Sequence, residues 1–128
     1  MKPEASAALA ESIDLAPTLL TAVGLKPTPD MTGLSFLDKA AIEKRDALFG
    51  EVFLHTAIDI EKPGANLRFR WIVQSNWKLI LPHAANEPGQ TAELYNLSKD
   101  PHETENLAAK HTDTVAALSA RLNAWWKP

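Results

Sequence analysis

Residues 67–81 read LRFRWIVQSNWKLIL, and this stretch decides the fold. Apolar and polar side chains alternate through residues 67–74, which is the pattern of a strand with one buried face. Ser75 and Asn76 then give a tight-turn signal, and residues 77–81 return as a second strand. The pair therefore predicts an antiparallel hairpin. We expect its first strand to bury one row of side chains: Leu67, Phe69, Trp71 and Val73.

Outward from this hairpin, two more strands and two helices are predicted. Residues 47–55 and 92–96 have strand composition, and turn-rich segments surround them. A helix is expected over residues 15–23, with Asp14 as its N-cap and Gly24 as its stop. A second helix is expected over residues 114–126, with Thr112 or Asp113 as its cap and an apolar stripe of Val115, Leu118, Leu122 and one of the two final tryptophans.

This order predicts an α+β fold. About four strands form one antiparallel sheet, the C-terminal helix packs on one of its faces, and the N-terminal helix comes before the sheet. The composition changes at Ala47, so we divide the chain into a segment of residues 1–46, with the first helix and a connector, and a domain of residues 47–128.

Composition excludes several classes of function. The chain has 128 residues, a formal net charge of −3 and no run of basic residues, which argues against a nucleic-acid partner. No apolar stretch approaches the roughly 20 residues of a membrane span, so no membrane partner is expected. Cysteine is absent, which rules out disulfides, thiolate catalysis and cysteine-ligated metals.

Four motifs, in this order, resemble the C-terminal end of a known enzyme family. They are SIDLAPTLLTAVGL at residues 12–25, MTGLSFL at 31–37, NWKLI at 76–80 and ELYNLSKDPHETENLA at 93–108, followed by a last helix that ends in tryptophan. The family is the sulfatases, the arylsulfatase-like members of the alkaline-phosphatase superfamily. The last motif resembles their ELYDL-x-x-DP-x-E-x-x-NL pattern, with Asn96 where aspartate is more usual.

The resemblance implies a parent reaction that this chain lacks the groups to perform. Sulfatases hydrolyse sulfate esters or sulfamates with a formylglycine, made from the first residue of a Cys/Ser-x-Pro-x-Arg motif, and with a calcium ion. This sequence contains neither that motif nor a recognisable calcium cluster, so we expect no catalytic residue, metal ligand or cofactor in it. We expect it to be the C-terminal subdomain of such an enzyme. Residues 1–46 would then be the end of the large catalytic domain, which would be its main partner.

The 93–108 motif also has a reading from its residues alone. Asp100-Pro101 starts a turn. Glu103, Glu105 and Asn106 can satisfy backbone donors ahead of the last helix, so a structural role is expected for them.

Polar side chains at the strand ends are the remaining site candidates. The four histidines show no i, i+4 zinc spacing, so no metal site is expected. The resemblance implies that the loop of residues 56–66 faces the substrate cleft. His55, Arg68 and Arg70 are therefore the candidate substrate-binding residues, because a guanidinium binds oxyanions through two parallel hydrogen bonds. The alternative for the two arginines is one solvated face of a strand.

Two other functions stay open. One is a free-standing, non-enzymatic interaction module that forms homo-oligomers through exposed apolar surface, including the apolar face of the first helix. The other is a fragment of a phosphatase or phosphodiesterase relative in the same superfamily.

Overall fold

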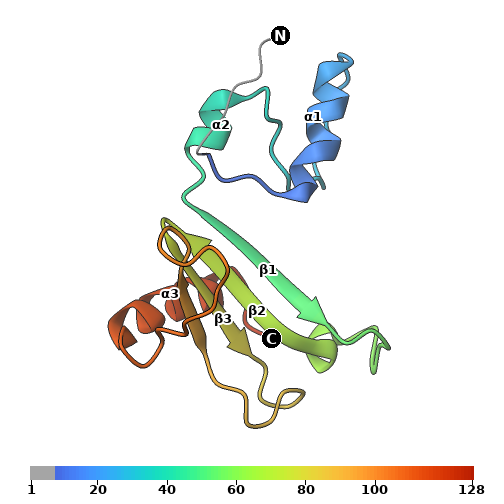
Figure 1. The fold of residues 1–128 in the computed structure, drawn as a ribbon. Helices are drawn as coiled ribbons and strands as arrows, with labels where there is room; N and C mark the ends of the chain where they lie inside the picture. The colour runs from blue at the N-terminus through green and yellow to red at the C-terminus, as the bar shows by residue number, and fades with distance from the viewer. Residues whose placement is uncertain (1–7) are drawn as a thin grey trace. The chain divides into compact units, whose positions relative to one another are not determined.

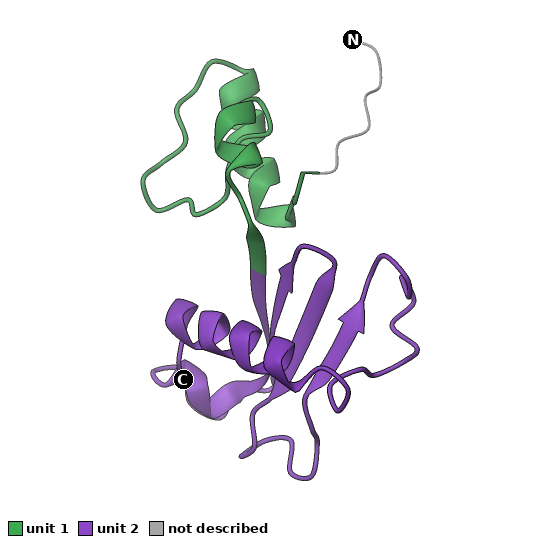
Figure 2. Cartoon of the chain, turned by 90° about the vertical axis from the view of Figure 1, so that its left-hand side faces the viewer, with its two compact units in different colours: residues 1–48 green, residues 49–128 purple. Residues whose placement is uncertain are grey.

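The computed structural model describes residues 8–128; residues 1–7 of the predicted first segment lie outside the described part. The chain forms two compact units, residues 1–48 and 49–128, and the boundary between them falls inside the first strand (Figure 2). The elements, labelled as in Figure 1, are α1 (Leu15–Ala22), α2 (Lys39–Glu43), β1 (Ala47–Phe53), β2 (Leu67–Gln74), β3 (Trp77–Pro82), β4 (Glu93–Asn96) and α3 (Thr112–Trp125), with short 3-10 turns at Ser12–Asp14 and Pro63–Asn66.

The strands form one four-stranded sheet in the order β1-β2-β3-β4, and α3 packs on it. The predicted hairpin is confirmed, because β2 and β3 pair antiparallel with Ile72 opposite Leu79 and Gln74 opposite Trp77. Its turn places Ser75 at φ +52°, in the left-handed region. The α+β architecture expected from the sequence is therefore present.

The face of the sheet that α3 covers is the one opposite to our expectation. Ile72, Leu79 and Leu94 stand opposite one another on three neighbouring strands, and all three are 0% exposed. They share the core of this unit with Leu118 and Leu122 of α3. Of the row predicted to be buried, only Leu67 is fully so, while Phe69, Trp71 and Val73 are half-buried. The alternation of residue types did not identify the covered face, because both faces of β2 carry bulky apolar side chains.

Aromatic contacts show how β1 is oriented beside α3. Phe49 stacks on Trp125 with ring centroids 5.2 Å apart, and Phe53 contacts Trp126 at 6.2 Å. Gly50 lies between these phenylalanines and faces the other way, because a Cβ placed on it would lie 2.3 Å from the Cζ2 atom of Trp71. Side chains therefore alternate along β1, and glycine is required where the strand passes the Trp71 ring.

The start of α3 differs from the prediction. The helix begins at Thr112, two residues earlier than expected, with His111 in the N-cap position and no side-chain cap. The expected caps, Thr112 and Asp113, therefore lie inside the first turn. Asp113 still contributes there, because a carboxylate near the N-terminus interacts favourably with the helix dipole.

In the first unit, α1 is close to its predicted range. Gly24 follows its end at φ +80°, as expected of a glycine stop. The apolar side chains Leu15, Leu19 and Val23 are 54%, 67% and 72% exposed. This helix therefore presents an uncovered apolar face.

Candidate functional site

The three residues predicted to bind substrate lie in or near the start of β2 and the loop before it. His55 follows β1 in an exposed position and makes no hydrogen bond with the described residues. Arg68 and Arg70 are alternate residues of β2 and point to the side of the sheet that α3 covers. Each of the two arginines has its own partner, and no contact joins either one to His55.

Arg68 keeps part of its guanidinium accessible. Its Nε–H donates to the carboxylate of Glu87, and its side chain remains 43% exposed. The hydrogen bond from Arg68 to Glu87 raises the pKa of this arginine above its ordinary value. The carboxylate offsets part of the positive charge, while the terminal amino groups of Arg68 stay available to a second acceptor.

Arg70 is engaged inside the fold. Its Nη1–H donates to the backbone carbonyl of Trp126, just after the end of α3. Burial lowers the pKa of Arg70 below its ordinary value. This geometry indicates that Arg70 holds the end of the helix on the sheet.

Two asparagines order the loops beside Arg68. Asn66 is 7% exposed, and its side-chain oxygen accepts from the backbone N–H groups of Ile58 and Asp59, the latter at 3.1 Å. Asn86 donates to the carbonyl oxygens of Ala65 and Leu67 at 2.9 and 2.6 Å. The loop that carries His55 is therefore tied to β2 through amide groups that the sequence did not single out.

The 93–108 segment is structural, as expected, but with a different division of roles. Asp100 accepts from the backbone N–H groups of Thr104 and Glu105 at 2.7 and 2.9 Å. These backbone hydrogen bonds, first of all the one from Glu105, lower the pKa of the Asp100 carboxyl. Asn106 bonds the free edge of β4, accepting from Leu94 at 3.0 Å and donating to Ala92 at 3.2 Å.

Glu103 and Glu105 do not satisfy backbone donors, contrary to the prediction. Glu103 pairs with Lys78 through both carboxylate oxygens, at 2.8 and 2.7 Å, and Glu105 pairs with Lys110 at 2.6 Å. Glu103 lies at φ +56°, and the ion pair with Lys78 secures the segment in this uncommon conformation.

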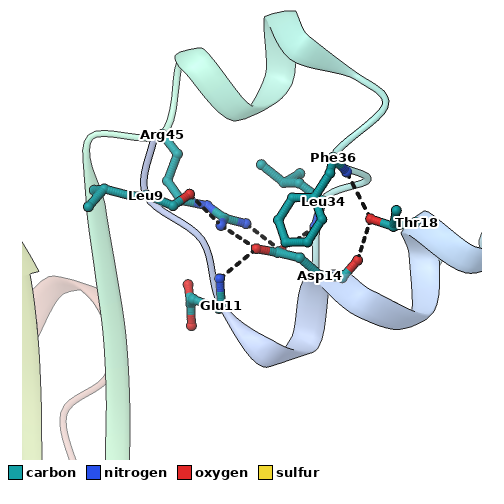
Figure 3. A network of polar contacts seen from close by, with 7 residues as sticks. All are labelled: Leu9, Glu11, Asp14, Thr18, Leu34, Phe36 and Arg45. Atoms are coloured by element: carbon teal, nitrogen blue, oxygen red, sulfur yellow. Dashed lines mark hydrogen bonds and ion pairs between the residues drawn. The ribbon is translucent and has the colours of Figure 1, made fainter. Parts of the chain in front are cut away.

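Asp14 was predicted to be only a helix cap, but its carboxylate makes several hydrogen bonds inside the first unit. Asp14 makes no side-chain cap on α1; it is 0% exposed and binds Arg45 through two hydrogen bonds of 2.6 and 2.7 Å (Figure 3). It also accepts from the backbone N–H groups of Glu11 and Leu34. The hydrogen bond from Arg45 is the largest cause that lowers the pKa of Asp14 to about 2. Sequence spacing gave no signal for this pair, because 31 positions separate its members.

The described residues do not fit a metal centre. Within residues 8–128 no group of three or more histidine, aspartate or glutamate side chains is arranged to hold a metal ion. A calcium ion of the sulfatase type would need several oxygen ligands at one point. No described helix is long and apolar enough to cross a membrane.

This chain matches a known family and several solved structures. A family model described as N-sulphoglucosamine sulphohydrolase, C-terminal, matches residues 1–127. No curated protein sequence matches the chain. Among solved structures, BT1596, described as a 2-O GAG sulfatase, aligns with a TM-score of 0.63 at 23% identity, over 88% of this chain and 23% of that one.

Two further structures share the fold. BT4656, solved in complex with its substrate D-glucosamine-2-N,6-O-disulfate, aligns with a TM-score of 0.61 at 22% identity, over 87% of this chain and 22% of that one. The phosphonate monoester hydrolase of Agrobacterium radiobacter aligns with a TM-score of 0.59 at 26% identity, over 87% of this chain and 23% of that one. The chain thus spans less than a quarter of these solved chains.

Proposed function

Because this chain belongs to the N-sulphoglucosamine sulphohydrolase C-terminal family of sulfatases, we propose that it works as the C-terminal subdomain of a longer sulfatase. The parent reaction is the hydrolysis of a sulfate ester or sulfamate. The formylglycine nucleophile and the calcium ion would come from a large catalytic domain, since the described residues do not fit the metal. This chain would contribute packing and part of the wall of the substrate cleft.

The observation that carries this proposal is the distribution of apolar side chains in the first unit. Its buried residues include the ion pair of Asp14 with Arg45, and among the described residues its buried apolar side chains are Pro17, Ile42 and Ala47. Its large apolar side chains are mostly at the surface, where a contiguous apolar patch marks an interaction site. The exposed ones are Ile13, Leu15, Leu19, Val23, Leu25, Phe36 and Leu37. Such a unit is expected to complete its core against the catalytic domain.

The proposed contribution to the cleft concerns His55, Arg68 and Arg70. His55 is exposed on a loop that Asn66 holds in place, and Arg68 has terminal amino groups without a described acceptor. These features support contact with an anionic sugar, because arginine and protonated histidine both donate to oxyanions. The bond from Arg70 to the Trp126 carbonyl supports a positioning role for this residue, toward the end of α3.

One observation favours a second candidate, a phosphonate or phosphate-ester hydrolase. The phosphonate monoester hydrolase has the highest sequence identity of the three structures compared above, at 26%. Both reactions place a charged tetrahedral centre before a nucleophile, and the fold of this subdomain does not distinguish them. Substrate discrimination would reside in the catalytic domain and in the residues that face the cleft.

The test is complementation of a catalytic domain. The chain would be fused to a sulfatase catalytic domain that carries the Cys/Ser-x-Pro-x-Arg motif, and hydrolysis of an aryl sulfate and of an aryl phosphonate ester would be measured. The chain alone should turn over neither ester, because the groups that perform the chemistry are absent. Greater activity on the phosphonate ester would favour the second candidate.

Matched variants identify the docking face and the cleft residues. Leu19→Lys should abolish the activity of the fusion, whereas Ala120→Lys, at an exposed position of α3 in the second unit, should preserve it. His55→Ala and Arg68→Ala should raise KM more than they lower kcat, because these groups would bind substrate rather than react. A catalytic domain that is as active without the chain would contradict the subdomain role and leave the free-standing interaction module.

A further inference from the structure

The two edges of the sheet differ in how their backbone groups are satisfied. At the β4 edge, the side chain of Asn106 accepts from the N–H of Leu94, and the N–H of Leu107 donates to the Leu94 carbonyl at 2.8 Å. This edge is therefore closed by the chain itself. Among the described strands, β1 has β2 as its only neighbour, so its outer edge pairs with no strand (Figure 1).

The open edge lacks the features that usually prevent strand addition. The seven residues of β1, ALFGEVF, contain no proline and no lysine, and Glu51 is their one charged residue. Val52 and Phe53 are 42% and 39% exposed. Proteins usually protect a long edge strand with lysine, proline or a covering segment, and an unprotected one is a template for another strand.

The alternation along β1 determines which side chains would meet in such a pair. Phe49 and Phe53 contact the tryptophans at the end of α3, while Gly50 faces Trp71 on the other side of the sheet. Leu48 and Val52 are on the Gly50 side, because successive side chains of a strand point to opposite faces.

We propose that β1 pairs antiparallel with β1 of a second copy of this chain, about a two-fold axis at Gly50. This register uses all seven residues and sets Leu48 against Val52 and Ala47 against Phe53, each pair formed twice. It places Glu51 opposite Phe49 of the other copy, so no two like charges face each other.

The neighbouring registers are worse. An axis at Glu51 would place the two Glu51 carboxylates directly opposite each other, which is destabilising. An axis at Phe49 would leave Phe53 unpaired within the strand. The sequence of β1 is thus self-complementary about Gly50, which fits the isologous contact of a two-fold dimer.

Light scattering with the intact chain tests the dimer. The expected result is a dimer whose fraction rises with protein concentration. Val52→Lys should raise the dissociation constant about tenfold or more, because an apolar cross-strand pair is lost twice. The control Ile58→Lys, at a loop position 66% exposed, should leave it unchanged. A monomer at all concentrations, or a dimer that dissociates on Leu19→Lys but not on Val52→Lys, would overturn the proposal.

Cross-linking tests the register, because the natural chain contains no cysteine. A mixture of the variants Leu48→Cys and Val52→Cys should form a disulfide between unlike chains, since facing residues lie about 4.5–5.5 Å apart between Cα atoms. Leu48→Cys alone should not, because the two cysteines would be offset by four residues, or about 13 Å. Efficient cross-linking of Leu48→Cys alone would refute the register.

Discussion

The closure of the β4 edge by Asn106 gives a prediction whose size follows from its contacts. The Asn106 side chain accepts from Leu94 and Ala108 and donates to Ala92. Leu94 is 0% exposed, so Asn106→Ala leaves its N–H without a partner, at a cost of about 1–3 kcal/mol. Water can replace the other two bonds, which together add about 1 kcal/mol. We therefore expect the second unit to lose roughly 2–4 kcal/mol of unfolding free energy.

Urea unfolding followed by tryptophan fluorescence measures this change in one unit only. All four tryptophans lie in residues 49–128, so the signal reports the second unit. Asn106→Asp is the matched control. A carboxylate oxygen can still accept from the Leu94 and Ala108 N–H groups, and only the hydrogen bond donated to the Ala92 carbonyl is lost. The midpoint should shift clearly for alanine and much less for aspartate, with the urea dependence unchanged. Equal shifts for the two variants, or none, would refute the view that Asn106 satisfies the Leu94 donor.

Four other perturbations follow from the structure. As pH falls from about 4 toward 2, protonation of Asp14 should remove roughly 2 kcal/mol from the first unit, because its pKa of about 2 lies below the ordinary value near 4. Hydrogen exchange of the Leu34 amide should accelerate over the same range. Gly50→Ala should destabilise the second unit by about 1–3 kcal/mol and shift its tryptophan emission, since the new methyl group meets the Trp71 ring. In thermal unfolding, Leu79→Ala should lower the unfolding free energy by about 2–5 kcal/mol, and a melting curve like that of the unaltered chain would contradict its place in the core. Trp71 is half-buried, so Trp71→Ala should cost less than the ~3–5 kcal/mol of a fully buried tryptophan.

The sequence predicted the elements well because their signals are local. Gly24 marked the end of α1, and Ser75 and Asn76 marked the hairpin turn. The choice of the covered face could not be made this way. The Arg68 side of β2 looks polar in the sequence, yet Arg70 bonds the end of α3 and Ile72 fills the core beneath that helix.

The site was harder to predict, because its contacts are not local. Nothing in the local sequence indicates that Asp14 meets Arg45, or that Glu87 meets Arg68 across 19 positions. Asp14 was expected only to cap a helix, and Glu87 was not singled out. Residue type indicated that a guanidinium was present at Arg68 and Arg70, but only the fold shows what each one binds.

The bond between Arg70 and Trp126 also bears on the electrostatics of α3. The last turn of this helix contains no basic residue, although the carbonyl groups at a helix C-terminus carry a partial negative charge. Arg70 supplies the missing cation from a strand 56 positions earlier, and Asp113 supplies an anion at the opposite end. The direction of the helix across the sheet is thus favoured by charge as well as by shape. A helix packed in the opposite direction would bring its N-terminus, which carries a partial positive charge, next to the Arg70 guanidinium.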